Sequence, residues 1–302
     1  MSAAPGLPDA TRLRSGAEAL AGPLPPLLAE AERLAASVLP GGHGRRRSGP
    51  GDEFWQYRAA TSSDPASRID WRRSARSDAH FVRETEWQTA QTVTLWVDSA
   101  RAMEFSSDRA RPPKAERARL VALAAAVLLI RAGERVGLMR PAALPLPPRT
   151  GQAQLGALAQ ALAADADDRD YGAPDGGLPP AHSRAVFLSD FLGDLDPVEA
   201  ALTSAADRGV RGALVQVLDP AEESFPYDGR AIFESMQGGL RHETLRAGDL
   251  RERYRDRLAA RKDRLEALGR LTGWQVSCHH TDTPASVALM WLWHALAARE
   301  TR

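Results

Sequence analysis

The chain has 302 residues, and its 39 Lys and Arg balance 39 Asp and Glu, so the formal net charge is zero. This balance argues against a strongly basic nucleic-acid binder and against an acidic tail protein. The charged fraction of 26% and the apolar fraction of 43% are typical of a globular protein. A single cysteine, Cys278, excludes an internal disulfide and a structural zinc site built from several cysteines. Only Lys114 and Lys262 are lysines, which we attribute to genome composition.

No segment has the pattern of a membrane span or a secretory signal. The longest apolar run covers the eleven residues 120–130, whereas a span needs roughly 20 residues. Residues 1–26 are rich in Ala, Pro and Gly and lack the apolar centre of a signal peptide. We therefore expect a soluble, cytoplasmic protein with no membrane contact.

The first 91 residues divide into two predicted regions. Residues 1–44 are expected to form a tail and a short helix, because apolar residues recur at helical spacing over 27–38 before Pro40. Residues 45–91 form an appendage rich in Arg and aromatic residues. We also expect a Gly/Arg loop over 41–51, across the boundary of the two regions, and a strand over 79–88 in the appendage.

From residue 92 onward, short apolar runs alternate with longer amphipathic ones. The predicted strands are 92–97, 134–140, 184–189, 212–218 and 274–278, and the predicted helices are 114–132, 151–164, 197–208, 249–271 and 284–298. This alternation predicts a parallel sheet with right-handed crossovers and helices on both faces. We expect residues 92–302 to form one doubly wound, Rossmann-like α/β domain, with a strand-and-turn insertion near 220–245. An acidic, Gly/Pro-rich stretch over 165–180 is interpreted as a linker that begins at the amino edge of the sheet.

Three predicted strands end in an aspartate: Asp98, Asp190 and Asp219. Ligands of doubly wound sheets bind beyond the carboxyl ends of the strands, and carboxylates there suit Mg²⁺. One hypothesis is therefore a divalent-metal-dependent hydrolase that uses these carboxylates. Aspartate is also a common helix-capping residue, so a structural role stays open. The sequence contains no G-x-S-x-G elbow, phosphate loop or dinucleotide-binding fingerprint.

Other candidate groups have simple structural interpretations. His279 and His280 are adjacent on a predicted strand, so their side chains point to opposite faces and cannot bind one ion together. Cys278 is expected to be a small core residue. The arginines of residues 45–83 could contact nucleic acid, but aspartates and Glu53 are interleaved with them and can pair with them instead.

The segment GDEFWQYR over residues 51–58, Asp64 and the string RIDWRRSAR over 68–76 are the most specific part of the sequence. They offer Arg and Asp for bidentate pairing and aromatic residues for packing. This order resembles the von Willebrand factor A-like domain-of-unknown-function family 58, over roughly residues 45–300. We expect these residues to be structural, with the appendage packed on the sheet domain and Asp70 paired with an arginine. The family-motif residues are Glu53, Arg68, Asp70, Trp71, Ser74 and Arg76.

The resemblance implies a von Willebrand A-type fold, whose metal site uses D-x-S-x-S, a Thr and a second Asp. Asp98, Thr150 and Asp190 match the Asp and Thr positions, but Ala100 and Ala102 replace the two serines. Alanine offers a cation no oxygen, so we expect a degenerate site without metal or other cofactor. Arg101 is expected to neutralise Asp98.

The resemblance also implies a partner, because such proteins are associated with MoxR-type AAA+ ATPases. We therefore expect a non-enzymatic adaptor that acts in protein maturation or complex assembly. It would dock through a binding rim at the carboxyl edge, with a possible contribution from residues 52–76. The metal-dependent hydrolase and the nucleic-acid binder remain as alternatives. The predicted rim residues are Asp98, Ser99, Arg101, Glu104, Thr150 and Asp190.

Overall fold

A six-stranded sheet forms the centre of the computed structural model, in the order β11-β8-β7-β4-β5-β6. All neighbouring strands in it are parallel except β5 and β6, which are antiparallel. Its strands are β4 (Thr92–Val97), β5 (Arg135–Leu138), β6 (Leu146–Arg149), β7 (Arg184–Ser189), β8 (Arg211–Leu218) and β11 (Gln275–His280). The structure describes residues 26–38, 45–49, 53–61, 64–75, 79–140, 146–165, 167–175, 177–236, 238–239 and 241–297.

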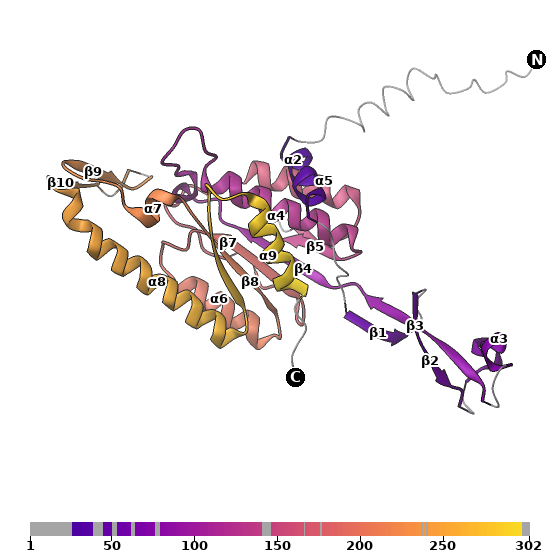
Figure 1. The fold of residues 1–302 in the computed structure, drawn as a ribbon. Coiled ribbons are helices and arrows are strands. Elements are labelled where there is room, and N and C mark those ends of the chain that lie inside the picture. Colours follow the sequence, from indigo (N-terminus) through magenta and orange to yellow (C-terminus); the bar gives the residue numbers. More distant parts are fainter. Residues whose placement is uncertain are drawn as a thin grey trace, which may run out of the picture.

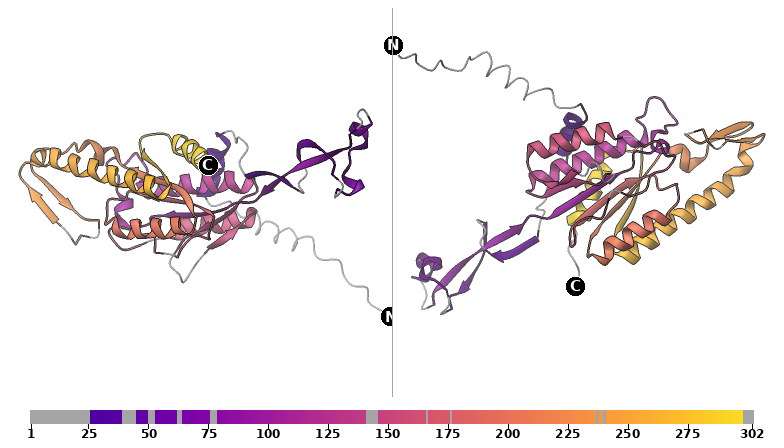
Figure 2. Two further views of the ribbon diagram at one scale, coloured as in Figure 1. Left: turned by 90° about the horizontal axis from the view of Figure 1, so that it is seen from below. Right: turned by 180° about the vertical axis from the view of Figure 1, so that it is seen from behind.

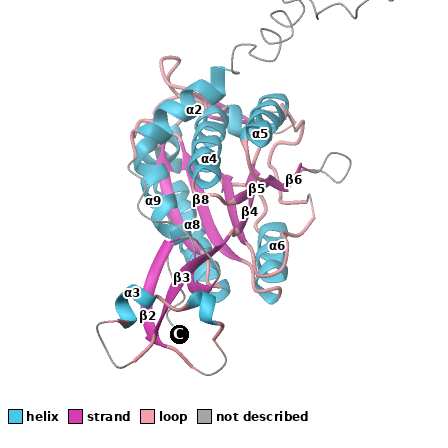
Figure 3. Cartoon of the chain, turned by 90° about the vertical axis from the view of Figure 1, so that its right-hand side faces the viewer, coloured by secondary structure: helices cyan, strands magenta, loops and turns pink. Residues whose placement is uncertain are grey.

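Helices cover both faces of this sheet (Figure 1), which confirms the predicted α/β class. One face packs on α4 (Lys114–Arg131), α5 (Gln152–Ala164) and α9 (Ala285–Ala297), with α4 flanked by α5 and α9 (Figure 3). Helix α2 (Pro26–Ala36) packs on the outside of these three helices. The other face packs on α6 (Asp196–Asp207) and α8 (Arg251–Thr272). Because successive side chains of a strand point to opposite faces, the sheet has an apolar core on each side. Leu95 and Val97 pack into the core under α4, and Trp96 packs into the core under α6 and α8.

Helix α4 carries the longest apolar run and lies in the core, with residues 120–129 all buried. Its position between the sheet and three other helices explains why it lacks a polar face. Among the helices of the described residues, none is both long and apolar enough to cross a lipid bilayer.

The appendage is a three-stranded antiparallel sheet in the order β1-β3-β2. It consists of β1 (Arg45–Gly49), β2 (Glu53–Ala59), β3 (Phe81–Thr89) and a one-turn helix, α3 (Trp71–Ser74). The predicted loop over 41–51 is therefore wrong at residues 45–49, where backbone pairing with β3 makes a strand without an apolar pattern.

The appendage projects from the α/β body instead of packing across it, in contrast to the prediction (Figures 1 and 2). Only residues 90 and 91 separate the end of β3 from the start of β4, so the appendage lies at the amino edge of the central sheet. The two surfaces that were predicted to bind a partner, the carboxyl rim and residues 52–76, therefore lie at different ends of the molecule.

Strand β6 was not predicted, and it reverses the chain at the edge of the sheet. Its sequence, Leu-Pro-Pro-Arg, suits an edge position because proline has no N–H for a second ladder. Arg149 pairs with Val136 and Leu146 with Leu138, so β6 runs back to the amino edge. Thr150, the residue after β6, therefore lies at the edge opposite Asp98.

Between β8 and α8 the chain forms α7 (Pro220–Ser224) and an antiparallel hairpin of β9 (Ala231–Glu234) and β10 (Arg241–Thr244). The hairpin lies beside the first turns of α8 (Figure 1). Phe225 contacts the rings of Tyr227, Phe233 and Tyr254, which ties the insertion to α8. This agrees with the strand-and-turn pattern expected for residues 220–245.

Candidate functional site

Asp98 directly follows β4 and lies buried at the carboxyl edge, with 3% of its surface exposed. Its carboxylate accepts the Ala100 amide at 2.9 Å and the Ser189 hydroxyl at 2.6 Å. Burial raises the pKa of Asp98 to about 6, against the opposing effect of these two hydrogen bonds. Gly172 covers the carboxylate so closely that a Cβ there would lie 2.1 Å from Oδ1. Asp98 is thus enclosed by its own chain.

Asp190, which follows β7, binds a buried lysine. The Lys114 ammonium, at the first residue of α4, donates to Asp190 Oδ2 at 2.7 Å and to Glu222 Oε1 at 2.6 Å. Both Lys114 and Asp190 are 1% exposed. Burial works against the charge of Lys114, but the two carboxylates outweigh it, and the net effect raises its pKa. The chain itself therefore supplies a cation at this edge.

Sequence reasoning missed Lys114 and assigned the neutralising charge to Arg101. The structure instead pairs Arg101 with Asp168 at 2.6 Å on the surface. The rarity of lysine was the available signal, since an arginine-rich chain that keeps a lysine indicates a site-specific need.

Asp219, which follows β8, is fully buried and serves as a helix cap. It accepts the Ala221 amide at 2.8 Å, while Glu222 returns a bond to the Asp219 amide, so the two form a capping box. The Ser107 hydroxyl donates to it at 2.5 Å. Although burial opposes it, hydrogen bonding to Ser107 and the backbone lowers the net pKa of Asp219. All three strand-end aspartates are therefore engaged within the chain.

The acidic stretch over 165–180 was predicted to be a linker that begins at the amino edge. The structure instead places most of its described residues on the rim at the carboxyl edge. Asp167 forms a β-bridge with Ala100, and the amides of Arg101 and Ala102 donate to the carbonyls of Arg169 and Asp170 at 2.9 and 2.8 Å. The position of the stretch follows from β6. Because β6 ends at the amino edge, α5 runs back toward the carboxyl edge and leads the chain into the stretch there. A pocket of about 200 Å³ lies between this stretch and Asp98, lined in part by Ser99, Arg140, Asp168 and Arg169.

The rim thus contains most of its predicted residues but not Thr150. Asp98 and Asp190 are buried beneath it, Ser99 is half-buried, and Arg101 and Glu104 are exposed. Glu104 lies 3.7 Å from the Arg119 guanidinium. Thr150 is exposed at the opposite edge, as the register of β6 requires.

In the appendage, the family-motif residues support one another locally. Asp70 caps α3 by accepting the Arg73 amide at 3.1 Å, and it also accepts the Tyr57 hydroxyl at 3.0 Å. Ser74 is buried and bridges the Asp70 carbonyl and the Phe81 amide at 2.8 and 2.9 Å. Trp71 is 57% exposed and contacts the His80 ring edge to face. The side chains of Glu53 and Arg68, and all of Arg76, lie outside the described residues.

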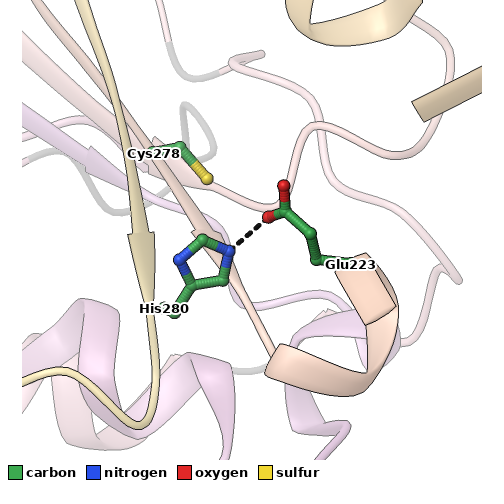
Figure 4. A group of neighbouring side chains, drawn as sticks. All are labelled: Glu223, Cys278 and His280. Carbon is green, nitrogen blue, oxygen red and sulfur yellow. Dashed lines mark hydrogen bonds and ion pairs between the residues drawn. The ribbon is translucent and has the colours of Figure 1, made fainter. Parts of the chain in front are cut away.

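A second cluster lies where α7 and β11 meet: Glu223, Cys278 and His280 point toward one another (Figure 4). Their ligand atoms all lie within 4.8 Å of one another. His280 Nε2 contacts Glu223, and Lys262 Nζ donates to the other Glu223 oxygen at 2.6 Å. Among the described residues, Asp98, Asp190 and Asp219 form no comparable set of neighbouring ligand atoms.

The cluster corrects the prediction that Cys278 is a core residue. β11 is the edge strand of the sheet, and Cys278 is exposed on it, although its sulfur points into the cluster (Figure 4). Burial of the thiol raises the pKa of Cys278 to about 11. His279 points to the opposite face, as predicted, and burial lowers its pKa to about 4. An open groove of about 690 Å³, lined in part by Glu223, Lys262 and His280, runs past the cluster.

Comparisons with known proteins support the domain-of-unknown-function family 58 that the motifs indicate. Residues 56–264 match the family described as "Protein of unknown function DUF58". The chain is 28% identical over 220 residues to the uncharacterized proteins Mb1516 of Mycobacterium bovis and Rv1480 of Mycobacterium tuberculosis. The match covers 68% of this chain and 67% of each relative.

Two solved structures align with 68% of this chain. One is the conserved hypothetical protein BatB from Bacteroides thetaiotaomicron, with 10% identity, 97% of that chain covered and a TM-score of 0.39. The other is an aerotolerance-related membrane protein from Bacteroides fragilis, with 13% identity, 96% covered and a TM-score of 0.39. The family match spans more than half of the sequence, and the chain therefore belongs to the family "Protein of unknown function DUF58".

Proposed function

We propose that this chain is a non-enzymatic adaptor with a von Willebrand factor A-like sheet, whose carboxyl rim docks a MoxR-type AAA+ ATPase. Its role would be in protein maturation or complex assembly in the cytoplasm. The observation that carries the proposal is the buried ammonium of Lys114, which binds Asp190 and Glu222 where a metal-dependent site would need free carboxylates. Because the carboxylates of Asp190 and Glu222 beneath the rim are already neutralised by Lys114, the rim suits contact with another protein better than it suits metal-dependent catalysis.

The surface above that ion pair carries exposed charges of both signs. Arg101, Glu104 and Asp168 are all exposed, and they lie on segments joined by backbone hydrogen bonds. Loops held by a rigid sheet are common binding surfaces, and mixed charges at such a surface select partners and speed association. The MoxR-type partner itself comes from the family resemblance of residues 51–76.

The metal-dependent hydrolase has less support. Asp98 is held by Ser189, Asp190 by Lys114 and Asp219 by Ser107, so each carboxylate would have to leave an internal partner before it could bind a cation. Ala100 and Ala102 add no oxygen ligands.

Capture of the purified ATPase on the immobilised chain tests this proposal. We expect capture to be stronger with ATP than without nucleotide, to weaken in Arg101→Glu, and to weaken with added salt. Arg131→Glu is the matched control, because Arg131 is exposed at the last residue of α4, at the end opposite Lys114. Absence of capture in every nucleotide state, or equal loss in both variants, would contradict docking at the rim.

A further inference from the structure

We propose that Glu223, Cys278 and His280 bind a transition-metal ion of the Zn²⁺ class, at a site separate from the carboxyl rim. The proposal goes beyond the docking function and does not depend on it. Three observations support it: the spacing of the ligands, their chemistry and the open groove beside them.

The spacing follows from the fold. Cys278 and His280 are two residues apart on β11, so their side chains leave the same face of the strand. Glu223 reaches them from α7, one residue after Glu222, which binds Lys114. The three ligand atoms lie within 4.8 Å of one another. A tetrahedral Zn²⁺ site needs ligand separations of roughly 3.3–3.8 Å, which small rotations of these side chains can provide.

The ligand types fit one class of metal. Thiolate, imidazole and carboxylate together suit a borderline ion such as Zn²⁺ or Co²⁺, whereas Mg²⁺ and Ca²⁺ prefer oxygen alone. The thiol loses its proton when the ion binds. Three protein ligands leave a fourth position for water or another small ligand, and Glu223 and His280 both line the open groove of about 690 Å³.

The ammonium of Lys262 binds the same carboxylate, Glu223, that the ion would use. It donates to Glu223 Oε1 at 2.6 Å, while Glu223 Oε2 faces His280. The Lys262 side chain is 25% exposed and extends from α8, so it can move toward solvent when an ion arrives. The lysine therefore holds Glu223 in place in the absence of metal and competes with the ion for it.

Titration of the full chain with Co²⁺, followed by absorption, tests the site. We expect one equivalent to bind with tetrahedral d–d bands and a sulfur-to-cobalt charge-transfer band, and Zn²⁺ to displace it. Cys278→Ser should lose the charge-transfer band, and His280→Gln should weaken binding at least tenfold. His242→Gln is the matched control, because His242 is an exposed histidine on β10.

Lys262→Met provides an independent check that does not remove a ligand. Tighter Co²⁺ binding in this variant supports the proposed placement, and weaker binding contradicts it. Absence of a charge-transfer band in the wild type, its retention in Cys278→Ser, or equal weakening by His280→Gln and His242→Gln would overturn the proposal. Circular dichroism of each variant establishes that it is folded.

Discussion

The two lysines of this chain bind neighbouring glutamates of α7 in opposite environments. Lys114 is 1% exposed and binds Glu222 together with Asp190, whereas Lys262 is 25% exposed and binds Glu223 beside His280. Both interactions have bond lengths of 2.6–2.7 Å, so distance does not distinguish them. Burial does: a buried charge cannot leave its partner for water, while an exposed one can. The first cluster is therefore closed and structural, and the second is open to a ligand.

The largest effect should come from Lys114→Met, which keeps the volume of the side chain but removes its charge. The buried Asp190 and the half-buried Glu222 would be left without a cation, so we expect the free energy of unfolding to fall by roughly 3–5 kcal/mol. Urea unfolding of the variant and the wild type measures this loss.

A matched variant separates the lost charge from lost packing. The combined replacement Lys114→Met, Asp190→Asn and Glu222→Gln should recover much of the stability, because no buried charge is left uncompensated. A triple variant as unstable as Lys114→Met alone would show that packing dominates at this position.

Asp98→Asn should change the pH dependence of stability at the same edge. The folded pKa of Asp98 is raised from 3.8 to about 6, so its stabilising contribution is complete below pH 3.8 and is lost as the pH rises through 6. The shift corresponds to about 3 kcal/mol. The difference in the free energy of unfolding between Asp98→Asn and the wild type should therefore shift in favour of the variant, by up to that amount, between pH 4 and pH 7. Urea unfolding at both pH values gives the difference, and a constant difference would show that Asp98 does not titrate in this range.

In the appendage, Asp70→Ala should have a smaller effect. It removes the cap of α3 and the bond to Tyr57, and loss of an N-cap costs about 1 kcal/mol. Trp71→Ala is the control, because Trp71 is 57% exposed and should change the thermal midpoint little. A larger loss from Trp71→Ala than from Asp70→Ala would contradict the local role of the cap.

The smallest effect is expected for Lys262→Met. An exposed ion pair contributes about 0–1 kcal/mol, so the free energy of unfolding should stay within that range of the wild type. A loss as large as that of Lys114→Met, in the same urea experiment, would remove the contrast between the two clusters.

The alternation of strands and helices could be predicted because it depends on local patterns of apolar residues. The site was predicted less completely, and one short strand explains much of the difference. β6 has only four residues, two of them prolines, so no apolar period indicates it. Missing it reversed the predicted direction of α5, which misplaced both Thr150 and the acidic stretch.

The ion clusters could not be predicted because their members are distant in the sequence. Lys114 is 76 residues from Asp190 and 108 from Glu222. Only the order of strands in the sheet brings them together. Likewise, Cys278 and His280 are 55 and 57 residues from Glu223, and the position of β11 at the edge of the sheet is not visible in any local pattern.

Calorimetric titration with Mg²⁺ tests most directly whether Lys114 takes the place of a cation at the carboxyl edge. The account predicts no saturable binding to the wild type at millimolar Mg²⁺. If a specific site existed, Mg²⁺ at 100 times its Kd would stabilise the fold by about 2.7 kcal/mol. Because the account predicts no such site, the thermal midpoint should be unchanged by Mg²⁺. Saturable binding that disappears in Asp98→Asn and Asp190→Asn would contradict the account and favour the metal-dependent hydrolase.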